Sequence, residues 1–200
     1  MNASKNAASL ALSGEKINSD MDRDVIVKCQ NGDRQAFGYL VKKYMQRAYY
    51  IALGFIGSHE SAHDLSQEAF VRAFKAIKRF DPDKRFFTWY YQILRNLCLN
   101  FNRDKARHAR PFSEMNEHEI QRIPDAVDSS HLFERNETQK LVWEALNTIK
   151  PRDREIIVLK DLQDFSYKEI AEMLEIPIGT VMSRLYYARA ALKSRLERML

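Results

Sequence analysis

Two histidines one helical turn apart are the first residues of this sequence that could do chemistry. They flank the stretch His59-Glu60-Ser61-Ala62-His63, which has the pattern H-E-x-x-H. On a helix, both imidazoles could bind one zinc ion, and Glu60 could act as the base that activates a zinc-bound water. A metal-dependent hydrolase is therefore the first hypothesis.

The rest of the sequence lacks the other residues that such a zinc site needs. The extended motif requires a glycine and a histidine at fixed steps after His63, and those positions hold Ser66 and Ala69. No glutamate lies between Glu68 and Glu114, so the usual downstream glutamate ligand is also missing, and only Asp81 and Asp83 could substitute for it, from a turn. We therefore expect no metal, no cofactor and no enzyme activity, and we assign no catalytic residue.

Composition predicts a globular, helical chain. Of 200 residues, 45% are hydrophobic and 30% are charged, with only 6 glycines and 5 prolines.

No apolar run reaches the roughly 18 residues that a spanning helix needs, so we expect no membrane insertion. The first 20 residues are small and polar and favour a disordered tail over a signal peptide. Cys29 and Cys98 fall in apolar helical patterns, which fits buried thiols in a reducing cytoplasm.

Positive charge is concentrated in two blocks. Residues 84–110 hold seven lysines and arginines against one aspartate, a net charge of +6, and residues 182–200 have a net charge of +4. The strip between them, 111–131, has a net charge of −4, contains two prolines and lacks sustained periodicity, which favours a linker. The fold prediction is all-α, with two small helical domains joined by a flexible acidic linker. The predicted boundaries are 1–20 for the tail, 21–110 for the first domain, 111–132 for the linker and 133–200 for the second domain.

Apolar spacing predicts the helices of the first domain. Asp33 follows a turn that ends a short opening helix, and it can cap a long helix with apolar residues between 37 and 55. Gly57 ends that helix, and Ser58 can cap the next one, whose apolar residues run from 62 to 77.

The helix that begins at Phe86 combines an apolar face with a polar one. At about 100° per residue, one arc collects Phe86, Tyr90, Ile93, Leu94, Leu97, Cys98 and Phe101. The opposite face carries Gln92, Arg95, Asn96, Asn102 and Arg103, with Trp89 at the border. Aromatic rings stack on bases, and cations hold phosphates, when proteins bind single-stranded DNA. Trp89 could equally be a core residue, and periodicity leaves both interpretations open.

The last third of the sequence predicts a helix-turn-helix. A helix over 134–149 is followed by a second over 151–165 with Pro151 in its first turn, and Ser166 and Glu169 form a capping box that opens a third. A tight turn over 175–179 leads into a last helix from about Ile178. The apolar arc of that helix is Val181, Leu185, Ala188, Leu192, Leu196 and Met199. An ordinary helical hairpin is the alternative, and the capping box and basic outer face argue against it.

These patterns resemble a bacterial RNA polymerase sigma factor of the extracytoplasmic-function (ECF) group, from about Asp22 to Leu200. Residues 62–77 (AHDLSQEAFVRAFKAI) resemble sigma region 2.2, and residues 86–104 (FFTWYYQILRNLCLNFNRD) resemble regions 2.3 and 2.4. Residues 165–192 (FSYKEIAEMLEIPIGTVMSRLYYARAAL) resemble region 4. The resemblance implies promoter-specific transcription initiation in the cytoplasm, commonly as a stress response.

The resemblance also assigns roles to individual residues. Docking on the β′ clamp of core RNA polymerase falls to Asp64, Gln67, Glu68 and Arg72. Reading the minus-ten element as a single strand falls to Trp89, Arg95, Asn96 and Arg103. Reading the minus-35 element as duplex falls to Thr180, Met182, Ser183, Arg184, Tyr186 and Tyr187. The implied partners are core polymerase, through its β′ clamp and β flap, promoter DNA and an anti-sigma factor.

One position departs from the family pattern. Met182 stands where the family often has arginine or lysine, and methionine cannot make a bidentate contact with guanine. We therefore expect readout there to rest on apolar contact or to shift to Ser183, Arg184 and Tyr186.

A plain helix-turn-helix repressor is the remaining alternative, but it leaves Asp64 and the other residues of the docking set unused. A repressor should bind duplex promoter DNA without polymerase, whereas a sigma factor should not.

Overall fold

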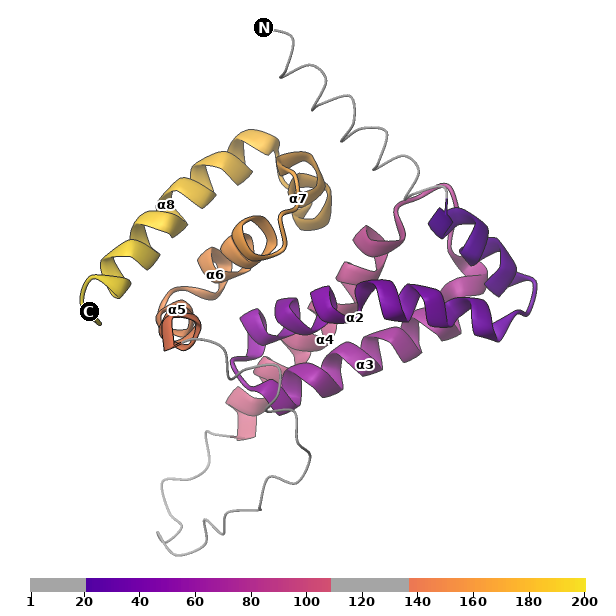
Figure 1. Ribbon diagram of the computed structural model, residues 1–200, viewed down its shortest axis with the longest axis horizontal. Coiled ribbons are helices and arrows are strands. Elements are labelled where there is room, and N and C mark those ends of the chain that lie inside the picture. Colours follow the sequence, from indigo (N-terminus) through magenta and orange to yellow (C-terminus); the bar gives the residue numbers. More distant parts are fainter. Residues whose placement is uncertain (1–20, 109–136) are drawn as a thin grey trace, which may run out of the picture.

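Helices are the regular elements of the computed structural model, which describes residues 21–108 and 137–200 (Figure 1). Across these two ranges the chain forms no β-strand, which confirms the all-α prediction. Within the same ranges, no helix combines the length and apolarity that crossing a membrane requires. The predicted tail at 1–20 and the predicted linker at 111–132 lie outside the described residues.

The N-terminal bundle begins and ends its helices at the predicted caps. Asp33 accepts hydrogen bonds from the backbone amides of Gln35 and Ala36, Gly57 ends the long helix with a φ of 73°, and Ser58 caps the next helix. Because only Gly57 and Ser58 separate two long helices, those helices pack side by side. The elements are a helix over 21–30, α2 (Arg34–Ile56), α3 (His59–Ala76), the 3-10 turn η1 (Ile77–Arg79) and α4 (Phe86–His108).

Aromatic rings fill the core of this bundle. Phe70 stacks on Tyr90 with ring centroids 4.3 Å apart, and Phe37 meets Phe74 edge-on at 5.1 Å. The Tyr90 hydroxyl is buried and donates a hydrogen bond to the Ser66 carbonyl at 3.0 Å, so the polar end of the ring is satisfied. These contacts fix α4 against α3 and determine which faces of both helices remain outside the bundle.

The C-terminal bundle contains the predicted helix-turn-helix. Both halves of the capping box form, since the Ser166 side chain accepts from the Glu169 amide and the Glu169 carboxylate accepts from the Ser166 amide. Glu175 ends this helix in the left-handed conformation, with a φ of 54°. The elements are α5 (Glu137–Thr148), α6 (Pro151–Ile157), the π-helical turn η3 (Val158–Leu162), α7 (Tyr167–Leu174) and α8 (Ile178–Leu196).

Two details of this bundle differ from the prediction. The helix expected over 151–165 changes to π-helical geometry at Val158, and the Phe165 amide bonds back to the Leu159 carbonyl. The wider turn shifts the register, and both Val158 and Phe165 are buried. Met199 was expected in the apolar arc of the last helix, but α8 ends at Leu196 and the Met199 side chain is 39% exposed.

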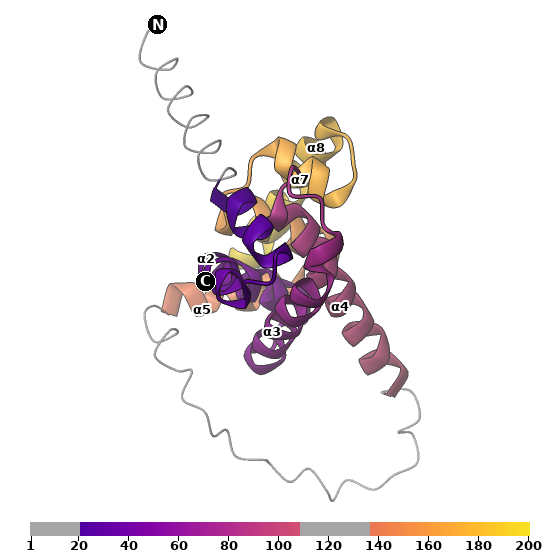
Figure 2. The same cartoon turned by 90° about the vertical axis from the view of Figure 1, so that its right-hand side faces the viewer.

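The two bundles pack directly against each other (Figures 1 and 2). Tyr50 of α2 stacks on Trp143 of α5 at 6.2 Å, and Phe87 of α4 stacks on Phe165 at 5.3 Å. Their buried apolar side chains form one continuous cluster. The sequence predicts two domains, and only the structure shows that they share a buried surface.

The capping box makes a measurable contribution to stability. We expect Ser166→Ala to lower the free energy of unfolding by about 1 kcal/mol, because the amides at the start of α7 lose their side-chain acceptor. Urea denaturation followed by circular dichroism measures this loss. Ser194→Ala, within α8, is the control and should cause no loss, since alanine is the better helix former there.

Candidate polymerase and promoter DNA interfaces

A polar face of α3 lies on the outside of the N-terminal bundle. The apolar side of the helix, which includes Ala62, Ala69 and Ala73, is buried and turns the polar residues outward. We call Asp64, Gln67, Glu68 and Arg72 the α3 polar face, and all four are exposed. The structure thus brings together the residues that sequence reasoning assigned to polymerase docking.

The side chains of the α3 polar face pair along their own helix. Arg72 Nε donates to Glu68 Oε1 at 2.8 Å, and the Gln67 amide lies 3.1 Å from the His63 ring. The Glu68 and Arg72 side chains are about half exposed, so their ion pair contributes little to folding. These groups are therefore available to exchange an intrahelical partner for one on another protein.

The residues assigned to the minus-ten element lie along α4 in different environments. Trp89 is partly buried and packs on Phe80 at 4.6 Å and on Phe86 at 5.8 Å, so one side of its ring belongs to the core. Asn96 and Arg103 are exposed, and the C-terminal end of α4 projects beyond the other helices (Figure 2). Trp89 therefore packs on the core without being fully buried, and a role in DNA contact stays a prediction.

Arg95 lies opposite the core of its own bundle, as predicted, but the C-terminal bundle covers it. Its Nε donates to Glu155 Oε1 at 2.8 Å, and the Tyr91 hydroxyl donates to the same oxygen at 2.5 Å. Burial, followed by the nearby Glu155 charge, raises the pKa of the Tyr91 hydroxyl well above its usual value, so this hydroxyl remains a donor. Gln92 also reaches the C-terminal bundle, where its amide donates to the Met173 carbonyl at 2.7 Å.

Sequence reasoning did not select Tyr91 or Glu155 for any site. A usable signal lies in the run Phe86–Ile93, which contains Phe, Trp, Tyr and Ile on nearly all sides of the helix. Such a distribution is typical of a helix that is buried on more than one side. Glu155, directly before the apolar run Ile156–Leu159, carries a weaker signal of the same kind.

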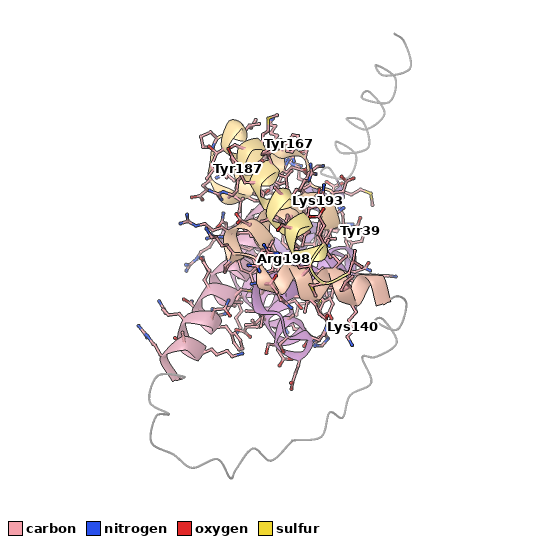
Figure 3. The ribbon with its side chains drawn as sticks, turned by 90° about the vertical axis from the view of Figure 1, so that its left-hand side faces the viewer. Tyr39, Lys140, Tyr167, Tyr187, Lys193 and Arg198 are labelled. Carbon is pink, nitrogen blue, oxygen red and sulfur yellow. The ribbon has the colours of Figure 1, made fainter. Side chains whose placement is uncertain are left out.

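The outer face of α8 carries both apolar and polar side chains that are exposed. Val181, Leu185 and Ala188 are buried beneath it, while Met182, Tyr186 and Tyr187 are 54%, 71% and 69% exposed. The α8 outer face comprises Thr180, Met182, Ser183, Arg184, Tyr186 and Tyr187. Thr180 and Arg184 are partly exposed and Ser183 is exposed, so the structure presents all six candidates on one side. Figure 3 shows Tyr187 and Lys193 along the outside of this helix.

The H-E-x-x-H stretch opens α3 without assembling a metal site. His59 Nδ1 lies 2.5 Å from the Tyr49 hydroxyl, and the two rings stack at 6.2 Å. Burial lowers the pKa of His59, which favours the neutral ring. Over residues 21–108 and 137–200, no three His, Cys, Asp or Glu side chains group in a way that could hold a metal ion.

Removing either histidine should leave the function intact. We expect His59→Ala and His63→Ala each to retain wild-type transcription with core polymerase, because neither imidazole has a ligand or proton-transfer role in our assignment. Transcription assays combined with metal analysis of the purified variants test this expectation. Loss of bound zinc together with loss of transcription would contradict it and revive the metal hypothesis.

Comparison with known families matches both bundles. Residues 40–108 match Sigma-70 region 2, a span that runs from within α2 to the end of α4. Residues 139–192 match Sigma-70 region 4, from within α5 to near the end of α8.

Curated relatives match over almost their full lengths. The RNA polymerase sigma-H factor of Pseudomonas aeruginosa is 27% identical over 190 residues, covering 92% of this chain and 98% of that protein. The ECF RNA polymerase sigma-E factor of Escherichia coli is 28% identical over 182 residues, covering 88% of this chain and 94% of that protein.

Solved structures share the arrangement of helices. CnrH, in complex with the cytosolic domain of CnrY, has a TM-score of 0.67 and 25% identity, covering 89% of this chain and 98% of that one. RpoE of Bartonella quintana, in complex with the anti-sigma factor NepR, has a TM-score of 0.64 and 24% identity, covering 80% of this chain and 96% of that one. The region 2 and region 4 matches, with full-length relatives of the same organisation, show that this chain belongs to the ECF group of sigma-70 RNA polymerase sigma factors.

Proposed function

We propose that three surfaces of this chain carry out separate steps of transcription initiation. The chain is a sigma factor and not an enzyme, so its function is to bind core RNA polymerase and to select promoters. The α3 polar face docks on the β′ clamp, and Trp89, Arg95, Asn96 and Arg103 of α4 read the minus-ten element as a single strand. The α8 outer face reads the minus-35 element as duplex. The domain boundaries of the sequence analysis stand as part of this proposal.

The exposure of the α8 outer face is the observation that carries this proposal furthest. A helix-turn-helix reads DNA by placing the early residues of its second helix in the major groove. In this chain those residues are small, aromatic or cationic and face outward, while the apolar side of α8 holds the helix in its bundle. Met182 contributes a thioether to that surface and is 54% exposed, and a thioether suits the methyl group of thymine better than the edge of guanine.

The α4 surface supports the proposal through its combination of charge and aromatic rings. Arg103 and Arg107 lie on the projecting end of the helix, where phosphates are reachable, and Trp89 lies more than three turns earlier with part of its ring accessible. Spacing along one helix would let a single strand contact cations and a stacking ring together.

The neighbouring structures support one further part of the proposal, an anti-sigma partner. CnrH and RpoE were each solved with a binding protein, and NepR is named as an anti-sigma factor. We include an anti-sigma factor among the partners of this chain, together with a cytoplasmic location and a role in a stress response.

Transcription in vitro tests the proposed function directly. The full chain, added to core polymerase and fragmented genomic DNA, should yield transcripts with defined start sites that core polymerase alone does not produce. Tight binding of the polymerase-free chain to duplex promoter DNA, without stimulated transcription, would instead identify a helix-turn-helix repressor.

A further inference from the structure

The helix over 21–30 has no part in the three proposed surfaces. It precedes residues 40–108, so the match to Sigma-70 region 2 does not include it. Its start is fixed to α2, because Asp22 is only 6% exposed and accepts hydrogen bonds from Lys43 Nζ, at 2.6 Å, and from the Tyr44 hydroxyl. A helix anchored in this way can hold another segment in place with the residue at its opposite end.

Gln30, the last residue of this helix, binds the backbone of a segment 47 to 50 residues away. Its side-chain amide donates to the Ile77 carbonyl at 2.9 Å and to the Phe80 carbonyl at 2.7 Å. Two carbonyl acceptors require the nitrogen of the amide, with its two hydrogens, to face them. Phe80 ends η1 in an extended conformation, so Gln30 fixes the point at which the chain leaves η1 and turns toward α4.

The Phe80 ring extends this restraint to Trp89. Phe80 is 6% exposed, and its ring centroid lies 4.6 Å from that of Trp89 and 6.1 Å from that of Phe86. Trp89 is the aromatic ring of the proposed minus-ten surface and is partly buried. A base stacks on such a ring more favourably when the ring is already ordered, because ordering it on binding costs conformational entropy. The position of the Phe80 backbone therefore affects how well Trp89 can accept a base.

A second contact joins the same helix to the turn that precedes α4. Arg23 Nε donates to Asp83 Oδ1 at 2.8 Å, but the two side chains are 51% and 73% exposed. An ion pair so open to solvent contributes little. The two hydrogen bonds of Gln30 are partly buried and lie directly at Phe80, so Gln30 is the contact with the larger expected effect.

We infer that Gln30 is a positioning residue for minus-ten recognition: it holds the Phe80 backbone so that the Phe80 ring orients Trp89 toward an unstacked base. This inference rests on the proposed function of Trp89. Gln30 acts through Phe80 and not by contacting DNA, so its effect must disappear when the Trp89 ring is absent. A residue that only stabilises the fold would have the same effect with or without that ring.

Gln30→Met tests the inference in a double-mutant cycle with Trp89→Leu. Methionine has a similar length but no donor, and leucine keeps an apolar side chain at position 89 without a ring. Each full chain is combined with core polymerase and a promoter recovered in the transcription experiment above, and permanganate reactivity of unpaired minus-ten thymines measures open complexes. We expect Gln30→Met to lower open-complex formation about tenfold, the order of one lost base–aromatic stack, and to have no further effect in the Trp89→Leu background.

Matched variants separate this effect from a general loss of folding. Gln46→Met makes the same replacement at an exposed position of α2 and should match wild type. Gln30→Lys keeps a donor for both carbonyls and should retain most open-complex formation, whereas Gln30→Glu places a carboxylate against them and should lose at least as much as Gln30→Met. Binding to core polymerase and minus-35 preference should match wild type in each folded variant.

The positioning role is overturned if folded Gln30→Met equals wild type, or if it lowers open-complex formation by the same factor with and without the Trp89 ring. If circular dichroism shows that Gln30→Met does not fold, Gln30→Lys and Gln30→Glu are compared in both backgrounds, and equal results for the two overturn the role. Trp89→Leu alone tests the proposed function of Trp89. Wild-type open-complex formation in that variant would refute that function and the positioning role with it, whereas failure of the positioning role alone leaves the Trp89→Leu loss in place.

Discussion

Glu68→Lys should weaken binding to core RNA polymerase by about 2 kcal/mol, or roughly 30-fold in Kd. The substitution would place a cation where the proposed docking site on the β′ clamp offers a basic surface. Glu68 is exposed on α3 and its carboxylate accepts a hydrogen bond from Arg72 of the same helix, so the fold should persist. Affinity is measured by titrating labelled full chain with core polymerase, with circular dichroism as the check on folding.

A charge swap separates docking from helix stability. Glu68 pairs with Arg72 along α3, so Glu68→Lys also loses an intrahelical ion pair worth about 0.3–0.5 kcal/mol. Combining Glu68→Lys with Arg72→Glu restores an ion pair on the helix but leaves the polarity of the docking face reversed. We expect the double variant to recover thermal stability and not polymerase affinity. Wild-type affinity in either variant would show that the α3 polar face is not the docking site.

Arg184→Ala should cost about 1–3 kcal/mol in promoter binding by the holoenzyme, with a loss that depends on the minus-35 sequence. Arg184 lies on the second turn of α8, where side chains of a recognition helix reach base edges. Transcription from a set of minus-35 variants measures both the size of the loss and its dependence on sequence. A loss that is specific to one base pair would identify the base that Arg184 reads.

Arg195→Ala is a matched control on the same helix. Arg195 lies 11 residues after Arg184, which is about three helical turns. The two arginines therefore lie on the same face of α8, but Arg195 is near its C-terminal end, away from the early residues that reach base edges. We expect no change in minus-35 preference for this variant.

Arg103→Ala, on α4, should weaken open-complex formation similarly on all promoters and reduce the salt dependence by about one unit of slope for a lost phosphate contact. A uniform loss for Arg184→Ala, or altered minus-35 preference for Arg103→Ala, would place the two reading surfaces in the wrong bundles.

The sequence alone determined most of the secondary structure and the composition of each helix face. Asp33, Ser58, Ser166 and Glu169 act as the predicted caps because capping depends on residues within one turn of each other. The exposed residues of the α3 polar face and of the α8 outer face followed from periodicity, since an apolar stripe turned toward a core leaves the opposite side exposed. Local sequence patterns were sufficient for caps, which depend on residues within one turn, and for helices that pack against a single core.

The tertiary structure decided what happens on faces where two bundles meet. Gln92, Arg95 and Glu155 are polar, and periodicity places polar residues in solvent whether or not another bundle covers them. Their hydrogen bonds depend on the approach of α6 and α7 to α4, residues 60 to 81 positions apart in sequence, and on the absence of a side chain at Gly54. Spacing within a helix carries no information about such distant partners, because burial of a charged group becomes favourable only when its counter-charge arrives with it. For the same reason the sequence identified Arg95 as a cation on an outward face, and only the folded chain paired it with Glu155.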